Sequence, residues 1–184
     1  MQRSAIGCEA VAPSRLTNAE MLQLFGLLNK EMAGEGKVGE LFLVGGAVMC
    51  LAFGARDATK DVDAVFEPAR VVREAAARVA VEAGVAQDWL NDAVKGFLGT
   101  RGEFDRFLDL SHLQIFVAQP AYLLAMKCAA LRLGEEFHDL DDVRYLLRHL
   151  NITSPEAALA VVTRYFDEKQ LPPKTRLILE SLFG

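Results

Sequence analysis

Two aspartates separated by one residue are the side chains of this sequence best suited to hold a metal ion. Asp61 and Asp63 flank Val62 in a run that becomes continuously apolar up to Phe66, which predicts a half-buried strand over residues 61–66. Side chains two residues apart on a strand project from one face, with alpha carbons roughly 6.6 Å apart, so both carboxylates can converge on one ion. Magnesium binds through one or two carboxylates together with substrate phosphates. The pair therefore predicts a magnesium (or manganese) site that a nucleoside triphosphate completes.

A pair of glycines precedes the aspartates and is suited to close contact with phosphate. Gly45 and Gly46 follow a short apolar strand run over residues 40–44, and residues 47–53 read as a short buried helix closed by a further glycine. Glycine lets the backbone approach a ligand closely, and the two amides, with the start of the helix, can receive phosphate oxygens. We expect Lys60, beside the first aspartate, to contact the nucleotide as well.

Each motif also has a simpler interpretation. A lone D-x-D is most often a solvated strand face, a lone Gly-Gly is most often a turn, and Lys60 beside Asp61 fits a surface charge cluster. The order of the motifs favours function: an apolar strand, Gly-Gly, a short helix, a loop with Arg56, Thr59 and Lys60, and then D-V-D leading into an apolar strand.

That order resembles the polymerase-beta-like nucleotidyltransferase superfamily, whose signature is a Gly-Gly or Gly-Ser turn followed by a D-x-D strand. The stretch reads LVGGAVMCLAFGARDATKDVDAVF and covers residues 43–66. The resemblance implies that Asp61 and Asp63 are metal ligands and that Gly45 and Gly46 contact the nucleotide phosphates. It also implies an enzyme that moves a nucleoside monophosphate from a triphosphate onto an acceptor hydroxyl.

A second stretch resembles the AbiEii branch of that superfamily, in which a helical lysine is followed by an acidic motif that opens the next helix. Residues 113–147 read LQIFVAQPAYLLAMKCAALRLGEEFHDLDDVRYLL. Lys127 would be the motif lysine, and Asp139, Asp141 and Asp142 the acidic motif. The branch implies the toxin of a toxin-antitoxin pair, with tRNA as an RNA acceptor and an antitoxin-type protein as partner.

The lysine and the acidic motif have functional and structural interpretations. A lysine ammonium suits phosphate, and phosphoryl-type transfer depends mainly on positioning and charge neutralisation, so Lys127 can hold the triphosphate and Asp139 and Asp142 can serve catalysis. Alternatively, the lysine extends from the edge of a buried helix, while Asp139 caps the next helix and Asp142 interacts with its dipole.

The third carboxylate found in many members of the superfamily has no clear counterpart here. The corresponding strand, predicted over residues 108–118, offers Asp109 near its start and Gln114 in its middle. Either Asp139 or Asp142 then takes that role, or the chain is a catalytically inactive nucleotide-binding or partner-binding module of the same fold. A third alternative is an unrelated α+β protein whose D-x-D lies on a solvated edge.

The elements around these motifs predict an α+β fold, with a small mixed sheet flanked by helices and a C-terminal helical tail. Residues 1–15 read as a loose N-terminal arm, residues 16–118 as the core, and residues 119–184 as a helical region packed on it. The first helix is predicted to begin at the capping box of Thr17 and Glu20, and its apolar face carries Leu22, Phe25, Leu28 and Met32. Six further helices are predicted: from Pro68 to Gly84, over residues 89–97, from Pro120, over residues 139–150, from Ser154 and Pro155, and over residues 174–183.

Composition narrows the class of protein and its compartment. The chain has 184 residues, of which 52% are hydrophobic and 24% charged, a balance typical of a domain that folds alone. A net charge of -5 argues against sequence-independent binding to a phosphate backbone, although it leaves room for a local basic patch. Cys8, Cys50 and Cys128 suit reduced core thiols, so we expect a cytoplasmic protein. The N-terminus has only Arg3 before Glu9 and lacks a continuous apolar stretch, so we expect no signal peptide. The longest uncharged run, over residues 41–55, is shorter than the roughly 18 residues of a membrane span.

Overall fold

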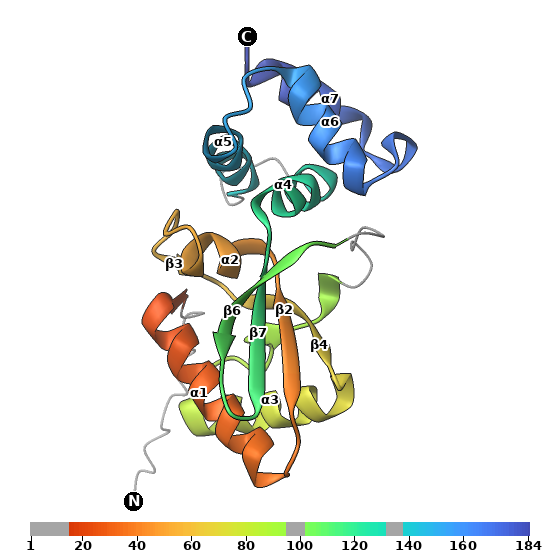
Figure 1. Cartoon of the computed structure of the whole chain (residues 1–184). Helices are drawn as coiled ribbons and strands as arrows, with labels where there is room; N and C mark the ends of the chain where they lie inside the picture. The colour runs from red at the N-terminus through yellow and green to blue at the C-terminus, as the bar shows by residue number, and fades with distance from the viewer. Residues whose placement is uncertain (1–14, 95–101, 132–137) are drawn as a thin grey trace, which may run out of the picture.

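The chain folds into a mixed sheet with helices on one face and a helical C-terminal tail, so the predicted α+β class is confirmed (Figure 1). The computed structural model describes residues 15–94, 102–131 and 138–184. The strands are β1 (Leu16–Thr17), β2 (Gly39–Leu43), β3 (Ala58–Thr59), β4 (Val62–Glu67), β5 (Leu90–Asn91), β6 (Phe104–Asp109) and β7 (Leu113–Ala118). The helices are α1 (Asn18–Gly34), α2 (Gly45–Leu51), α3 (Ala69–Ala83), α4 (Pro120–Ala129), α5 (Asp139–His149), α6 (Pro155–Tyr165) and α7 (Pro173–Ser181), with a 3₁₀ turn, η2, at Glu168–Gln170. The arm predicted for residues 1–15 lies outside the described residues except for Arg15.

The main sheet has five strands in the order β5-β4-β2-β7-β6. Strand β2 runs antiparallel to β4 and parallel to β7, β6 is antiparallel to β7, and β5 is parallel to β4. A second, two-stranded sheet pairs β1 with β3, so that Leu16 lies opposite Thr59. This pairing fixes the segment that leads into Asp61.

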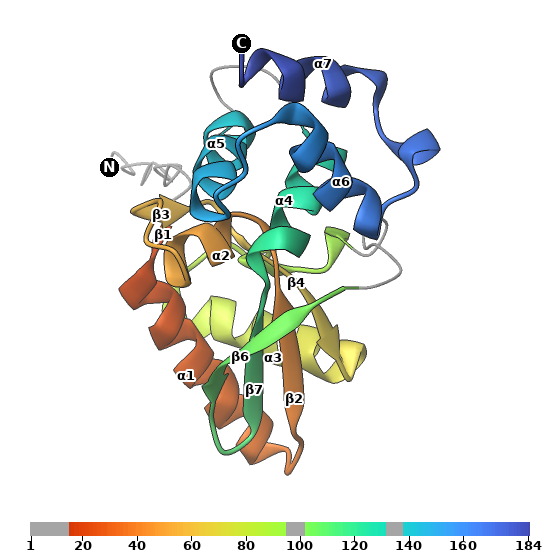
Figure 2. The ribbon, with the colours of Figure 1, turned by 45° about the horizontal axis from the view of Figure 1, so that its top comes forward.

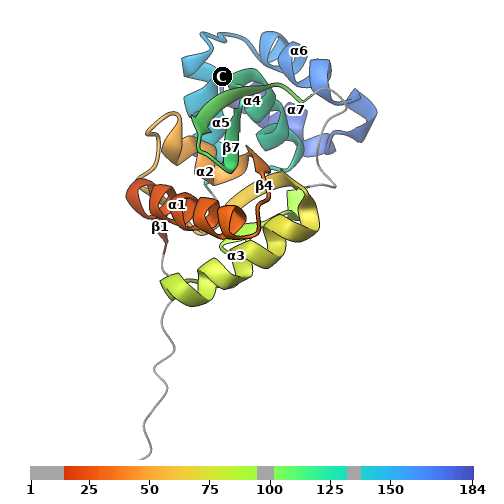
Figure 3. The ribbon, with the colours of Figure 1, turned by 60° about the horizontal axis from the view of Figure 1, so that its bottom comes forward.

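Helices α1 and α3 pack against one face of the sheet, as Figures 1 and 3 show. Thr17 caps α1, and the predicted capping box with Glu20 is confirmed. The buried stripe of α1 is Met21, Leu24, Phe25, Leu28 and Met32. Leu22 was predicted on that stripe, yet it is 44% exposed, because it is rotated by about 100° from the buried Met21.

Two predicted elements differ from the structure. The helix predicted over residues 89–97 is wrong at Leu90–Asn91, which form β5 beside Val62 and Asp63, while residues 95–97 lie outside the described part. The single strand predicted over residues 108–118 is a hairpin of β6 and β7, in which Asp109 lies opposite Gln114. The conformation of both segments is therefore determined by strand pairing and not by the local sequence pattern.

The helices α4 to α7 gather at one end of the sheet, beyond the end of β7 (Figures 1 and 2). Pro120 begins α4, and Ser154 caps α6 with Pro155 in its first turn, as the sequence predicts. Tyr165 Oη donates a short hydrogen bond to Glu103, which links the end of α6 to the residue before β6. No helix in the described ranges is long and apolar enough to cross a membrane.

Candidate functional site

Asp61 and Asp63 lie on the wall of the same cavity, which has a volume of about 400 Å³. Asp63 belongs to β4, whereas Asp61 occupies the bend just before the strand and accepts a hydrogen bond from Asn91 Nδ2 at 3.3 Å. Val62 between them is fully buried. The alternation predicted from the sequence thus brings both half-buried carboxylates to one side of the chain.

We call this space the charged cavity, because ionic side chains dominate its lining. It is lined by Arg15, Gly46, Arg56, Ala58, Thr59, Lys60, Asp61, Asp63, Lys127, His138 and Asp139. Four of these side chains are cationic lysine or arginine and three are carboxylates, so the lining carries one net positive charge with His138 neutral. The chain as a whole carries -5. The lining therefore offers both cations and oxygen ligands, and two of its cations, Arg56 and Lys127, are also paired with Asp142, which lies outside the lining.

The two glycines leave no room for side chains beside the carboxylates. Gly45 has φ +65°, and a Cβ placed on it would lie 2.8 Å from Asp63 Oδ2. A Cβ on Gly46 would lie 2.5 Å from Thr59 Oγ1. Helix α2 begins at Gly45 itself, two residues before the predicted start. The backbone at this point therefore packs directly against the side chains of the cavity wall, as glycine permits.

A second cavity of about 400 Å³ adjoins the charged one, and we call it the apolar cavity. It is lined by Val44, Gly45, Asp63, Ala93, Val94, Leu123, Met126, Lys127, Ala130 and Asp139. Asp63, Lys127 and Asp139 line both cavities and so form a shared wall. A molecule with one charged part and one flat apolar part would fit this pair of spaces.

Lys127, Asp139 and Asp142 form one ion-pair network together with Arg56. Lys127 Nζ lies 3.1 Å from Asp139 Oδ1 and 2.7 Å from Asp142 Oδ2. Arg56 Nε donates to Asp142 Oδ1 at 2.7 Å, and its Nη2 makes a second, shorter bond to Oδ2. The Asp142 side chain is only 3% exposed. Asp142 borders neither the charged nor the apolar cavity, but a third hollow of about 320 Å³ that Arg56 and His138 also line.

The other predicted acidic positions form no ion pair with this network. Asp141 is exposed and pairs with Arg144 at 3.1 Å, and Asp109 pairs with Arg106 at 2.7 Å. Neither Asp109 nor Gln114 lines the charged or the apolar cavity. Within the described residues, no group of three or more His, Cys, Asp or Glu side chains is placed to hold a metal ion. Asp139 is the further carboxylate that shares a cavity with Asp61 and Asp63.

The two described cysteines are buried free thiols that contribute nothing to the site lining. Burial raises the pKa of Cys50, although nearby Arg56 acts in the opposite direction. Burial also raises the pKa of Cys128 to about 12. Both residues agree with the prediction of core thiols, and Cys8 lies outside the described residues.

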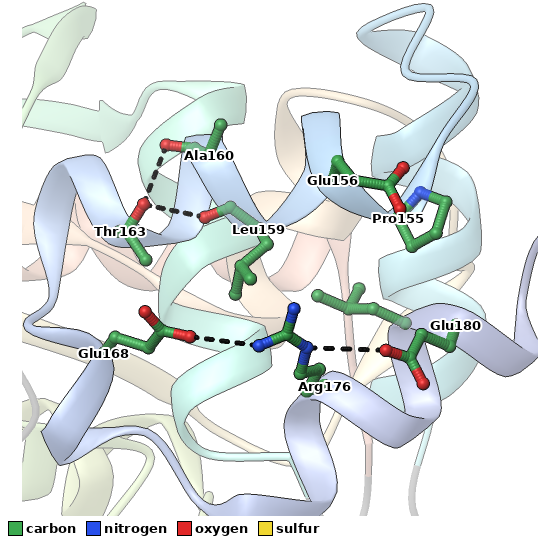
Figure 4. Close-up of a pocket in the computed structure, with 9 residues that line it drawn as sticks. Pro155, Glu156, Leu159, Ala160, Thr163, Glu168, Arg176 and Glu180 are labelled. Carbon is green, nitrogen blue, oxygen red and sulfur yellow. Dashed lines mark hydrogen bonds and ion pairs between the residues drawn. The ribbon is translucent and has the colours of Figure 1, made fainter.

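A separate hollow of about 270 Å³ lies between α6 and α7 (Figure 4). There Arg176 extends between Glu168 at 3.5 Å and Glu180 at 3.4 Å. It shares no lining residue with the charged cavity, and no residue predicted for the site lies in it. These ion pairs are exposed and serve helix packing at most weakly.

Several residues of the site were not assigned a role from the sequence. The sequence places Arg56 in the loop before the D-x-D segment without indicating a role, and Asn91 lies in the segment predicted as a helix. Arg15 and His138 line the charged cavity and approach each other to 3.4 Å. His138 directly precedes the first residue of α5. For these residues, the one local feature that could have indicated a role is the position of Arg56 five residues before Asp61.

The side chains present fit a hard divalent cation. Asp61 and Asp63 offer carboxylate oxygens on one cavity wall, and magnesium needs only one or two such ligands when phosphates and water complete its shell. Comparison of the chain with protein-family models, with curated proteins and with solved structures gave no match.

Proposed function

We propose that this protein is a metal-dependent nucleotidyltransferase that moves a nucleoside monophosphate from a triphosphate to an acceptor hydroxyl. The observation that carries the proposal is the pair of adjoining cavities with a shared wall of Asp63, Lys127 and Asp139. The charged cavity suits a polyphosphate with its metal ion. The apolar cavity suits the base and sugar, because small-molecule sites combine an apolar lining with a few placed polar groups.

In this proposal the residues of the chain bind, orient and neutralise. Asp61 and Asp63 hold magnesium or manganese, whose charge neutralises the leaving pyrophosphate when it is bound. Lys60 and Lys127 attract the phosphates, and the backbone at Gly45 and Gly46 approaches them closely. These roles agree with phosphoryl-type transfer, in which positioning and electrostatics do most of the work.

Asp139 takes the role of the third carboxylate. The acceptor oxygen attacks the alpha phosphorus, the bond to the bridging oxygen breaks, and pyrophosphate leaves with that electron pair. Asp139 accepts the hydroxyl proton, because it lies on the wall that both cavities share. Its ion pair with Lys127 orients the carboxylate before the acceptor arrives.

The acceptor and partners follow from the resemblance to the AbiEii branch rather than from geometry. We infer RNA, with tRNA ends as the first candidate, a role as the toxin of a toxin-antitoxin pair, an antitoxin-type protein partner and a cytoplasmic location. The four cationic side chains that line the charged cavity support an anionic acceptor in spite of the net charge of -5.

Labelled nucleotides provide the test. The purified chain is incubated with each triphosphate, cellular RNA and magnesium, and product is followed on gels. Asp61→Asn and Asp63→Asn should each lower the yield by about a hundredfold or more, because metal binding contributes several kcal/mol to transfer. Asp109→Asn is the matched control, since that exposed carboxylate lies outside both cavities. An undiminished product in Asp63→Asn would contradict the assignment.

A second candidate is a nucleotide-binding module without turnover. It is favoured by one observation: in the described part of the chain no third carboxylate is placed to hold a metal ion together with Asp61 and Asp63. Calorimetry separates the two, because a module binds a triphosphate with magnesium while the gel assay stays blank for every acceptor tried.

A further inference from the structure

We propose that Arg56 and Lys127 form a two-cation clamp for the triphosphate, and that Asp142 is the positioning residue that sets their separation. The inference deepens the proposed function and rests on it for the identity of the ligand. It assigns a binding role to Arg56, and it gives Asp142 a role other than contact with the substrate.

Asp142 is held by two cations and lines neither of the two cavities assigned to the ligand. Both of its oxygens accept from Arg56, and Oδ2 lies 2.7 Å from Lys127 Nζ. Its side chain is 3% exposed, and it lines neither the charged nor the apolar cavity. A buried carboxylate of this kind is stable only while its partners remain in place. Asp142 therefore acts on a ligand through the cations it holds.

Arg56 lines the charged cavity, and Asp142 holds its guanidinium in place. Its Nε and Nη2 are engaged by Asp142, and Nη1 lies 3.3 Å from where a Cβ on Gly46 would sit. Both Arg56 and Gly46 line the charged cavity. Guanidinium carries five donors in a planar fork that matches phosphate oxygens. Because Asp142 occupies one edge of the Arg56 guanidinium, the donors on the side of Gly46 can bind a phosphate.

The two cations come from distant parts of the chain and meet at one anion. Arg56 lies in the loop between α2 and β3, Lys127 in the last turn of α4, and Asp142 in the first turns of α5. Their side chains are mostly buried, with 18% exposure for Arg56 and 10% for Lys127. The carboxylate that they share holds the two cations in a fixed position relative to each other.

The network also has a purely structural interpretation, in which it only joins α5 to the loop after α2. The two interpretations differ in the effect that they predict on phosphate binding. A clamp changes the affinity for polyphosphate and its salt dependence, because each cation that contacts phosphate adds to both. A structural bracket changes only the unfolding temperature.

The test uses the full chain with inorganic tripolyphosphate and magnesium, followed by calorimetry over a range of salt concentrations. Arg56→Gln should weaken binding at least about tenfold and make its salt dependence shallower, since one charge-assisted contact is lost. Arg56→Lys should retain part of the affinity. Asp142→Asn should also weaken binding although it does not touch the ligand. Arg144→Gln is the matched control, because that arginine pairs on α5 with the exposed Asp141.

A double variant covers the case in which single variants fail to fold. Arg56→Gln with Asp142→Asn removes both charges of the pair and leaves no unpartnered carboxylate, so its fold should survive. It should still bind tripolyphosphate at least about tenfold more weakly than the natural chain. Wild-type affinity and salt dependence in a folded Arg56→Gln or double variant would overturn the clamp, as would a natural chain that binds no tripolyphosphate.

The binding experiment and the transfer assay test the two proposals separately. If tripolyphosphate binds through Arg56 but no labelled product forms, the clamp stands and the transferase proposal fails. If product forms and Arg56→Gln leaves the KM for the triphosphate unchanged, the clamp fails and the transferase proposal stands.

Discussion

The backbone conformation at Gly45 determines how the Asp63 carboxylate sits in the cavity wall. Gly45 has φ +65°, in the left-handed region that costs other residues roughly 1–2 kcal/mol. The space where its Cβ would lie is already occupied, because Asp63 Oδ2 is 2.8 Å away. A side chain at this position would therefore strain the backbone and displace a proposed metal ligand at once.

Gly45→Ala should lower stability by about 1–2 kcal/mol and also abolish most of the rise in unfolding temperature produced by a triphosphate with magnesium. Gly54→Ala is the matched control, because Gly54 has φ +59° and open space where its Cβ would lie. Thermal unfolding with and without nucleotide measures both effects. An equal nucleotide response in the two variants would show that the contact with Asp63 is unimportant.

At the residue scale, the sequence could predict only the local part of the site. Asp61 and Asp63 share a strand, so their common face follows from a period of two. The Arg56–Asp142 pair spans 86 residues of sequence and depends on how α5 packs. Nothing in local spacing encodes that contact, so Arg56 could be noted but not assigned.

At the element scale, strand pairing accounts for both predictions that were wrong. β6 and β5 are edge strands. The side chains of β6 are half-buried or exposed, so its alternation is weak. Leu90 follows the buried Trp89, an apolar pair that a helix could equally accommodate, yet it pairs with Val62 of β4. For elements with strong local signals, such as the capped α1 and the proline-initiated α4, the predicted start agrees with the observed one.

The link between α6 and the residue before β6 should be sensitive to alkali. Burial, together with the hydrogen bond to Glu103, raises the pKa of Tyr165 to about 12, compared with about 10 in an unfolded chain. The neutral phenol therefore stabilises the fold fully below about pH 10, and this contribution is lost as the pH rises toward about 12.

Tyr165→Phe should cost about 1 kcal/mol at neutral pH, because Glu103 keeps its bond from Arg164 at 2.9 Å. Between about pH 10 and pH 12 the variant should lose less stability than the natural chain, so their unfolding temperatures should converge. Chemical unfolding across this range measures the difference. Parallel curves would contradict a raised pKa at Tyr165.

At the scale of the whole molecule, the candidate site joins the sheet to the helical tail. The aspartates and glycines come from the β2 to β4 region, whereas Lys127 and Asp139 come from α4 and α5. The shared wall of the two cavities therefore forms only when both parts of the chain are folded together. A ligand that contacts both parts should stabilise them as a unit.

Hydrogen exchange should detect this coupling. A triphosphate with magnesium should slow exchange in β4 and at the start of α2 and also in α4 and the first turn of α5, while α7 should change little. Asp61→Asn is the control, because it retains the fold but loses a proposed metal ligand. Protection confined to β4 and α2 would show that the helical tail takes no part in binding.

The contrast between the cations in the charged cavity and the acidic chain as a whole also affects how fast a ligand arrives. At a distance of several nanometres, a nucleotide is repelled by the whole molecule, whose charge is -5. Only at shorter range do the cations of the cavity attract it. At low ionic strength this repulsion slows diffusional encounter, because the screening length there is tens of ångströms. Added salt should therefore speed capture and, by weakening the local contacts, speed release as well, so that rapid-mixing experiments find both rate constants rising together.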